Sequence, residues 1–204
     1  KEERERKEGA KKAAPKREQF RRNLTDYDSR LMRTTGGNWG QTYNAQAVVD
    51  AKVQVIVACD VTNEGNDCRQ LAPMFRQTIA NLGRKPDVGL GDKGYFSGPV
   101  IRDPEFAGIK LLVPPPMDEE PKIRHGKRAF LDSDEMKALL AEPENKRLYR
   151  LRQITVEPVF GQIKAAMKFR KFSFRGLRAV SNEWSLVCAA HNLLKVFRSA
   201  WCPS

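Results

Sequence analysis

The sequence has few of the residues that build zinc sites, disulfide frameworks or membrane spans. Its four cysteines, Cys59, Cys68, Cys188 and Cys202, are far apart and form no Cys-x-x-Cys pair, and the chain has only two histidines. Neither a zinc site nor a disulfide framework is therefore expected. No apolar run approaches the roughly 20 residues that cross a bilayer, and no signal-peptide pattern opens the chain. These absences indicate a reducing compartment, and we expect the protein in the cytoplasm, associated with the nucleoid.

Acidic residues are also scarce relative to basic ones. The 204 residues include 37 Lys and Arg against 25 Asp and Glu, for a formal net charge of +12. This surplus favours a polyanionic partner, nucleic acid above all. A hydrophobic content of 40% can supply one core, so we expect one domain at residues 23–204. The mixed-charge residues 1–22 are expected to form a flexible arm or solvated helix in front of it.

Periodicity and turn residues predict alternating strands and helices. In chain order the expected elements are a hairpin (43–49 and 53–61), a helix that opens at residues 67–70 and runs to residue 82, a strand (88–90), a short helix (99–103), a strand (109–113) and long helices at 146–170 and 180–197. Asp67-Cys-Arg-Gln70 reads as a capping box before the first long helix, and Gly83 ends that helix. Residues 114–145 mix charges with Pro and Gly, so we expect an exposed insertion there, with a small helix starting at Ser133.

An isolated acid follows the predicted strand at residues 88–90, in Gly91-Asp92-Lys-Gly-Tyr95. Ligands of open α/β sheets bind beyond the carboxyl ends of strands, so Asp92 is a candidate catalytic residue. The alternative is that Asp92 only shapes a glycine-rich loop, as Asp often does.

A second isolated acid lies in Thr155-Val-Glu-Pro-Val-Phe-Gly-Gln-Ile-Lys164, on an otherwise basic helix. The predicted apolar stripe contains Val156, Val159, Phe160, Ile163 and Met167, and Gln153, Glu157, Lys164 and Lys168 fall on one polar face. Pro158 places Glu157 at a helix start or a kink. Two carboxylates on a basic chain indicate metal-dependent phosphoryl transfer, because hard divalent cations need oxygen ligands. A plain surface charge is the alternative for Glu157.

The order of these elements, and several motifs, resemble the C-terminal part of a bacterial insertion-sequence transposase of the DDE class. The motifs are Asn23-Leu-Thr-Asp-Tyr-Asp-Ser-Arg30, Tyr43-Asn-Ala-Gln-Ala47, Asp92-Lys-Gly-Tyr95, Val156-Glu-Pro-Val-Phe-Gly-Gln-Ile-Lys164, Glu183-Trp184 and His191-Asn-Leu-Leu-Lys195. The resemblance implies an α/β, RNase H-like fold, a mixed sheet flanked by helices, here lacking its first strand. It also implies DNA nicking and strand transfer by the intact enzyme.

The same resemblance implies roles for individual residues. Asp92 corresponds to the second acid of the catalytic triad and Glu157 to the third, both holding Mg²⁺ or Mn²⁺. Tyr149, Arg152 and Lys164 correspond to the family's Tyr-Arg-Glu-Lys signature and, with Lys168, are expected to contact DNA at transposon ends and target. Arg152 departs from the pattern, because it lies one residue too far from Glu157 and Gln153 occupies its expected position. A homodimer is the expected active complex.

The first acid of the triad is missing from its expected setting, an Asp-Gly-Thr segment on the first strand. We expect that strand upstream of Lys1, which would leave this chain inactive by itself. Asp50 and Asp60 are the nearby substitutes, although a hairpin turn for Asp50 and a strand edge for Asp60 are the preferred interpretations. Two other functions stay open: an RNase H-like nuclease without strand transfer, and an inactive DNA-binding remnant.

The last helix and the segment before it raise two further questions. The helix places His191 on one face with Val180, Trp184, Cys188 and Leu194, so a packed, hydrogen-bonded histidine is expected there rather than a base. In the preceding segment Arg170, Lys171, Arg175 and Arg178 alternate with Phe169, Phe172 and Phe174. This pattern suits a DNA-contacting segment, or a connector that its phenylalanines anchor to the core.

Overall fold

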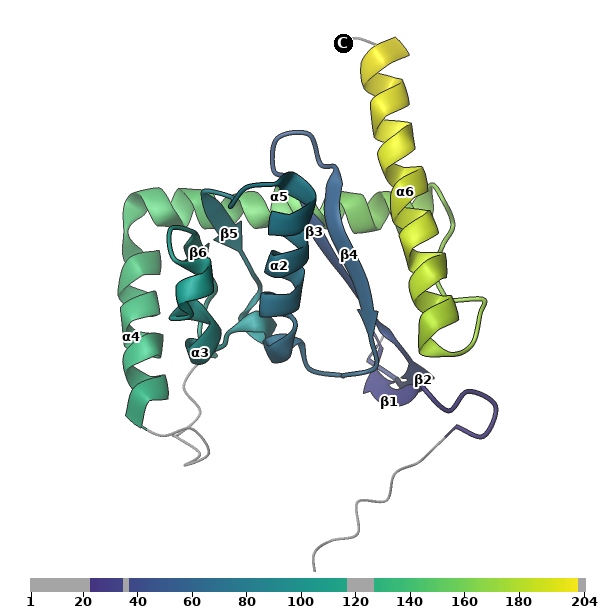
Figure 1. Cartoon of the computed structure of the whole chain (residues 1–204), viewed down its shortest axis with the longest axis horizontal. Helices are drawn as coiled ribbons and strands as arrows, with labels where there is room; N and C mark the ends of the chain where they lie inside the picture. The colour runs from purple at the N-terminus through teal and green to yellow at the C-terminus, as the bar shows by residue number, and fades with distance from the viewer. Residues whose placement is uncertain (1–22, 35–36, 117–126, 202–204) are drawn as a thin grey trace, which may run out of the picture.

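The computed structural model describes residues 23–34, 37–116 and 127–201, so the predicted arm at residues 1–22 lies outside it. Strands and helices alternate, and Figure 1 shows β6, β5, β3 and β4 following one another across the molecule, with α2 on one side and α5 on the other. The predicted α/β class with flanking helices is confirmed. Within the described residues the strands are hydrogen-bonded as three pairs, two antiparallel and one parallel.

Two hairpins begin the described chain. The first, β1 (Arg30–Arg33) and β2 (Trp39–Thr42), was not predicted, because a turn was expected at residues 36–40. The second, β3 (Asn44–Val49) and β4 (Ile56–Thr62), was predicted with its return strand three residues too early. The reason is Asp50, whose Oδ2 accepts the N–H groups of Lys52 (3.0 Å) and Val53 (2.8 Å) and holds them in the turn.

The next elements agree closely with the sequence. A short 3-10 helix, η1 (Asp67–Arg69), leads into α2 (Leu71–Leu82), and Gly83 ends it with φ +66°. The strand β5 (Val88–Leu90) then runs parallel to β6 (Lys110–Leu112). Gly89 allows α2 to pack on β5, since a Cβ there would lie 2.3 Å from Cζ of Phe75. Between the two strands lie η2 (Lys93–Tyr95), α3 (Gly98–Ile101) and η3 (Pro104–Phe106).

The region predicted as an exposed insertion contains a helix longer than expected. This helix, α4 (Lys127–Ala141), begins before Ser133, the predicted start. Met136 in this helix has 3% of its surface exposed, and Asn145, near the start of the next helix, is fully buried. The Asn145 Oδ1 accepts from Lys110 Nζ at 3.1 Å, which ties the region to β6. Residues 117–126 of the predicted insertion lie outside the described chain.

The helix α5 (Pro143–Ala165) runs unbroken through Pro158, although a new helix start or a kink was expected there. Proline at 158 leaves the carbonyl of Ile154 without its helical N–H partner. Gln54 replaces that partner: its Nε2 donates to the Ile154 carbonyl at 2.9 Å. Gln54 lies in the turn between β3 and β4 with φ +58°, a conformation that is unfavourable for a residue other than glycine.

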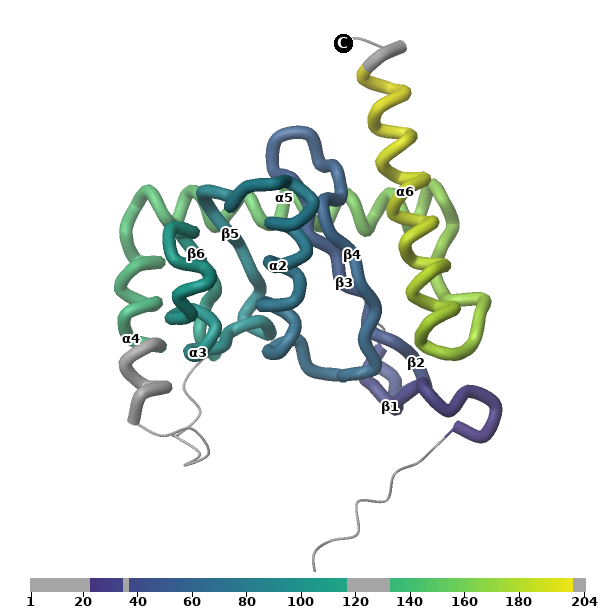
Figure 2. The backbone as a smooth tube through the Cα atoms, viewed as in Figure 1, coloured from purple at the N-terminus to yellow at the C-terminus, as the bar shows by residue number. Residues whose placement is uncertain are grey.

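The helix α6 (Leu177–Trp201) covers β4 and buries Val180, Trp184, Cys188 and His191, as predicted. His191 Nε2 lies 3.2 Å from the backbone carbonyl of Gln54, so the expectation of a packed, hydrogen-bonded histidine is confirmed. Leu194 was expected in the core but is 39% exposed, because the second half of α6 projects beyond the other elements (Figure 2). In the part of the chain that the structure describes, no helix is long and apolar enough to cross a membrane.

Replacing Gln54 with alanine should lower the free energy of unfolding by about 2 kcal/mol, because its side chain makes two hydrogen bonds, to the Ile154 carbonyl and to Lys195 Nζ, and each usually contributes about 1 kcal/mol. Pro158→Ala restores an N–H for the Ile154 carbonyl, so Gln54→Ala should cost less in that background. Urea denaturation of the four proteins of this double-mutant cycle measures the difference. If Gln54→Ala lowers the free energy of unfolding by the same amount in the wild-type and Pro158→Ala proteins, Gln54 does not replace the missing N–H partner of the Ile154 carbonyl.

Cys59 on β4 and Cys188 on α6 form a hydrogen-bonded thiol pair. The hydrogen bond from Cys188 lowers the pKa of Cys59 to about 7, and the same interaction raises the pKa of Cys188. In a Cys68→Ser/Cys202→Ser background, alkylation of Cys59 by iodoacetamide should therefore reach half its maximal rate near pH 7. Replacing Cys188 with alanine should shift that midpoint upward, and an unchanged midpoint would show that Cys188 is not the donor.

Candidate active site

Asp92 lies at the carboxyl end of β5, where it was predicted. The backbone of Gly91 continues the parallel pairing, since its N–H donates to the Leu112 carbonyl at 3.1 Å. Gly91 packs closely there, since a Cβ would lie 3.0 Å from a methyl group of Val113. The exposed Asp92 then caps η2: its Oδ1 accepts the N–H of Lys93 at 2.7 Å. One carboxylate oxygen thus shapes the loop, and the other makes no hydrogen bond within the described chain.

A buried polar network fixes this loop against β3. The hydroxyl of Tyr95 donates to Gln46 Oε1, and Gln46 Nε2 donates to Asp67 Oδ1 at 2.9 Å. Asn44 Nδ2 donates to the same oxygen at 2.6 Å. Burial raises the pKa of Tyr95, and the negative charges of Asp67 and then Asp92 raise it further. The tyrosine therefore stays a neutral donor between two carboxylates.

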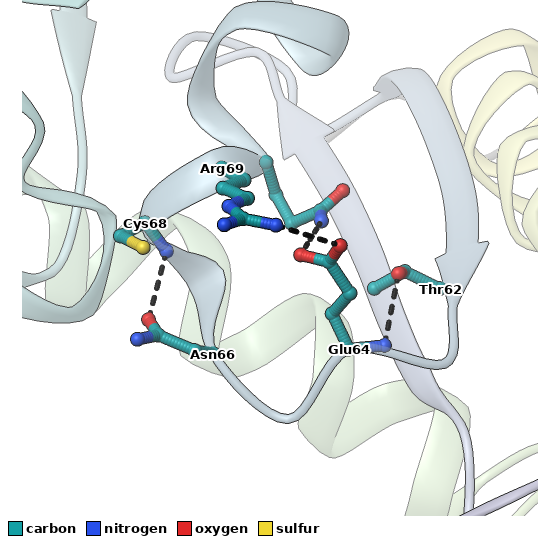
Figure 3. A network of polar contacts seen from close by, with 6 residues as sticks. Thr62, Glu64, Asn66, Cys68 and Arg69 are labelled. Atoms are coloured by element: carbon teal, nitrogen blue, oxygen red, sulfur yellow. Dashed lines mark hydrogen bonds and ion pairs between the residues drawn. The ribbon is translucent and has the colours of Figure 1, made fainter. Parts of the chain in front are cut away.

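The loop that carries Asp67 is itself held by polar contacts (Figure 3). Asn66 Oδ1 accepts the N–H of Cys68 at 3.0 Å and so forms the cap that was predicted for Asp67. Glu64 Oε2 accepts a hydrogen bond from Gln70 Nε2 at 3.5 Å, and Glu64 Oε1 lies 3.6 Å from Arg69 Nη1. With Asn66 as the cap, the Asp67 carboxylate is available to the network around Tyr95.

Sequence reasoning missed Gln46 and Asp67 as members of the site. Gln46 is 2% exposed in the middle of β3, and burying an amide requires partners. The available signal was the spacing of Asn44 and Gln46, which places two amides on one face of a strand. Their partner, Asp67, is more than 20 residues away in the sequence, so spacing alone could not identify it.

The helix α5 brings Tyr149 and Arg152 to the same region. Burial raises the pKa of Tyr149; the charge of Arg152 opposes this rise and that of Asp92 adds to it. The Arg152 guanidinium lies 5.8 Å from the centre of the Tyr149 ring. Its Nε is buried and has no hydrogen-bond partner among the described residues. Arg152 thus occupies the site despite its shifted position in the sequence pattern.

Glu157 and Lys164 lie exposed on α5, two turns apart on one face. Glu157 and Asp92 are both acids and cannot form an ion pair with each other, so only a shared cation could join the two predicted carboxylates. Lys168 was expected on the same helical face as Glu157, which is wrong. It lies beyond the end of α5 with φ +57°, because the helix stops at Ala165.

Asp50 and Asp60 have local roles. Both amide partners of Asp50 lie in its own turn. Asp60 is exposed on β4 and accepts the N–H of Val61 at 2.7 Å. These contacts are the ones expected of a turn and a strand edge.

Residues 23–34, 37–116 and 127–201 contain no group of three or more His, Cys, Asp or Glu side chains able to hold a metal ion. Asp92 and Glu157 nevertheless offer the right donor chemistry for a hard divalent cation, since both are exposed and retain unused carboxylate oxygens.

Beside Lys164 lies a cavity of about 940 Å³ between the two hairpins and the segment that joins α5 to α6. Its walls carry Arg33, Lys164, Arg170, Lys171 and Arg175. Asp26 and Asp67 also line the cavity, but their carboxylates already accept hydrogen bonds from the protein. Basic side chains therefore outnumber acidic ones among the charged groups of the cavity.

Comparison with known proteins agrees with this arrangement. A family model described as the transposase DDE domain matches residues 19–193. No curated protein and no solved structure matches the chain.

Replacing Tyr95 with phenylalanine should lower the free energy of unfolding by about 1 kcal/mol, because Gln46 loses the hydroxyl that pairs with its buried oxygen. Amide hydrogen exchange at Lys93 and Tyr95 should also accelerate, since the loop loses its attachment to β3. Tyr27→Phe, at a 67% exposed tyrosine, is the matched control and should change neither quantity. Similar exchange in both variants would show that the network does not hold the loop.

Proposed function

Because this chain belongs to the transposase DDE domain family, we propose that it is the catalytic part of a DNA transposase with an RNase H-like fold. The arrangement of β5 and α5 is the observation that best supports this function. Asp92 stands exposed at the carboxyl end of β5, and α5 carries Tyr149, whose pKa the charge of Asp92 raises, and Arg152, whose guanidinium lies over the Tyr149 ring. In the intact enzyme the reaction is metal-dependent nicking of DNA, followed by attack of the freed 3′ hydroxyl on target DNA.

Asp92 and Glu157 are the proposed ligands of Mg²⁺ or Mn²⁺. When bound, such an ion stabilises negative charge on the attacking and leaving oxygens of a phosphodiester. Among the protein groups, Asp92 holds its loop through Lys93 and keeps one oxygen available. The network from Tyr95 to Gln46 fixes the direction of that loop, so the carboxylate is oriented before any ligand arrives.

Tyr149, Arg152, Lys164 and Lys168 are the proposed DNA contacts. Lys164 and Lys168 are exposed and suited to phosphates, whereas Arg152 has a buried, unpaired Nε that a phosphate oxygen would satisfy. The net charge of +12 draws DNA to this face. We expect transposon ends and target DNA as partners, a homodimer as the active complex, and action in the cytoplasm at the nucleoid.

Two other functions remain to be separated from this one. An RNase H-like nuclease would cut DNA without joining the freed end to a target, so strand-transfer products decide against it. A DNA-binding remnant would bind DNA with strong salt dependence and show no response to divalent metal.

The metal assignment can be tested by thermal unfolding, without relying on activity. At Mg²⁺ concentrations about ten times the dissociation constant, the ion should stabilise the protein by about 1.4 kcal/mol and raise the melting temperature by a few degrees. Asp92→Asn and Glu157→Gln should each remove this shift. Both variants should still bind DNA, and somewhat more tightly, because each removes a negative charge.

Asp50→Asn is the matched control for this experiment, since it removes a carboxylate whose contacts are confined to its own turn. It should leave the Mg²⁺ shift unchanged. If Asp50→Asn abolishes the shift as fully as Asp92→Asn does, the ion binds elsewhere.

A further inference from the structure

Residues 168–176, here called the connector, join α5 to α6 and carry charge of one sign only. The segment reads Lys168-Phe-Arg-Lys-Phe-Ser-Phe-Arg-Gly176, with four basic residues and no acid. Such a segment is usually mobile, because like charges repel and no regular structure holds the backbone. In this structure the connector's backbone is instead held in place by contacts with the rest of the protein.

Two of its phenylalanines fix the connector to the core. Phe169 and Phe172 are partly buried against the hydrophobic cluster that contains Trp184. Their ring centroids lie 5.4 Å apart, and Phe172 packs edge-on against Tyr43 with centroids separated by 6.2 Å. The anchoring role that the sequence left open therefore applies to these two residues.

Three carboxylates fix the backbone. Glu183 accepts the N–H groups of Ser173 (2.9 and 3.0 Å) and Phe174 (3.1 Å). Asp26 accepts from Gly176 at 3.2 Å, and Asp28 accepts from Leu177 at 2.8 Å. The amino end of α6 is thus already occupied by acids, so an anion bound here must be held by side chains.

The side chains that these contacts leave outside are basic, with one aromatic among them. Arg170, Lys171 and Arg175 are exposed, and Phe174 keeps 61% of its surface exposed between Ser173 and Arg175. All four line the cavity beside Lys164. The exposed Phe174 ring can therefore add apolar contact to a ligand that the neighbouring basic side chains hold.

We propose that the connector binds DNA at an unpaired end, with Lys171 and Arg175 against phosphates and Phe174 stacked on an unpaired base. Fixed aromatic and basic groups in alternation are how proteins hold single-stranded nucleic acid. The connector contains no acidic residue, whereas most protein interfaces present charges of both signs. A polyanion therefore suits this segment better than another protein does. The proposal rests on the proposed function, and extends it by naming the form of DNA that this chain prefers.

The test uses the full chain and two fluorescent oligonucleotides, a blunt duplex and the same duplex with a short unpaired 3′ end. Binding is followed by fluorescence anisotropy as a function of salt. Lys171→Gln/Arg175→Gln should weaken binding and reduce the salt slope by about two, since each phosphate contact contributes about 0.7 to 0.9. Lys52→Gln/Arg84→Gln, which removes the same charge from two other exposed positions, should leave the slope unchanged.

Phe174 is tested by the difference between the two DNAs. The intact chain should bind the DNA with the unpaired end about tenfold more tightly, as one stacked base allows. Phe174→Ala should abolish that preference while leaving blunt-duplex binding unchanged, and Phe174→Trp should retain it. Circular dichroism of each variant checks that the fold is intact.

The outcomes separate this inference from the function on which it rests. If the chain binds DNA but the connector variants match their controls, the connector proposal is wrong and the DNA-directed function stands. If the intact chain binds neither DNA, both fail. A preference that survives Phe174→Ala would overturn the stacking role alone.

Discussion

One buried amide, Gln46, connects the parts of this protein that matter for function. Its backbone carbonyl accepts the indole N–H of Trp184 at 2.9 Å, which fixes α6 on the hairpin. Its side chain receives the hydroxyl of Tyr95 and donates to Asp67. Core, helix and candidate catalytic loop therefore converge on a single residue of β3. Burying an amide without hydrogen-bond partners costs free energy. The contacts of Gln46 with Trp184, Tyr95 and Asp67 therefore stabilise one another.

Several acids of the described residues fix the backbone. Asp26, Asp28, Asp50 and Glu183 all accept main-chain N–H groups. Burial opposes ionisation of Asp26, but the hydrogen bonds from Tyr43 and from backbone N–H groups outweigh it and lower its pKa. With these carboxylates engaged at turns and helix ends, the basic side chains dominate the field that an approaching polyanion meets.

Local signals in the sequence predicted much of the framework. Gly83 identified the end of α2, and the glycines around Leu90 identified the strand that leads to Asp92, because these residues act through their own backbone. The start of β4 was displaced, since the Asp50 side chain extends the turn by competing for nearby amides. The hairpin β1–β2 was missed because its four-residue strands carry no sustained alternation of apolar residues.

The candidate site was predictable only where its residues lie in motifs. Asp92, Tyr149 and Arg152 could be named from their neighbours in sequence, and in the structure the charges of Asp92 and Arg152 both act on Tyr149. Partners such as Gln46 and Asp67 come from different elements, and only the folded chain shows that they meet. The position of Glu157 relative to Asp92 likewise depends on how α5 crosses the strands, which no local pattern encodes.

The turn at Gln54 has a consequence for how α5 can move. Its side chain bonds both the Ile154 carbonyl and Lys195 Nζ (2.8 Å), and its own carbonyl meets His191. One of these bonds reaches α5 and two reach α6, so a single turn residue joins the two helices. The helix that carries Glu157 is therefore attached to the hairpin about one turn before that residue, by a side chain with no role in the chemistry.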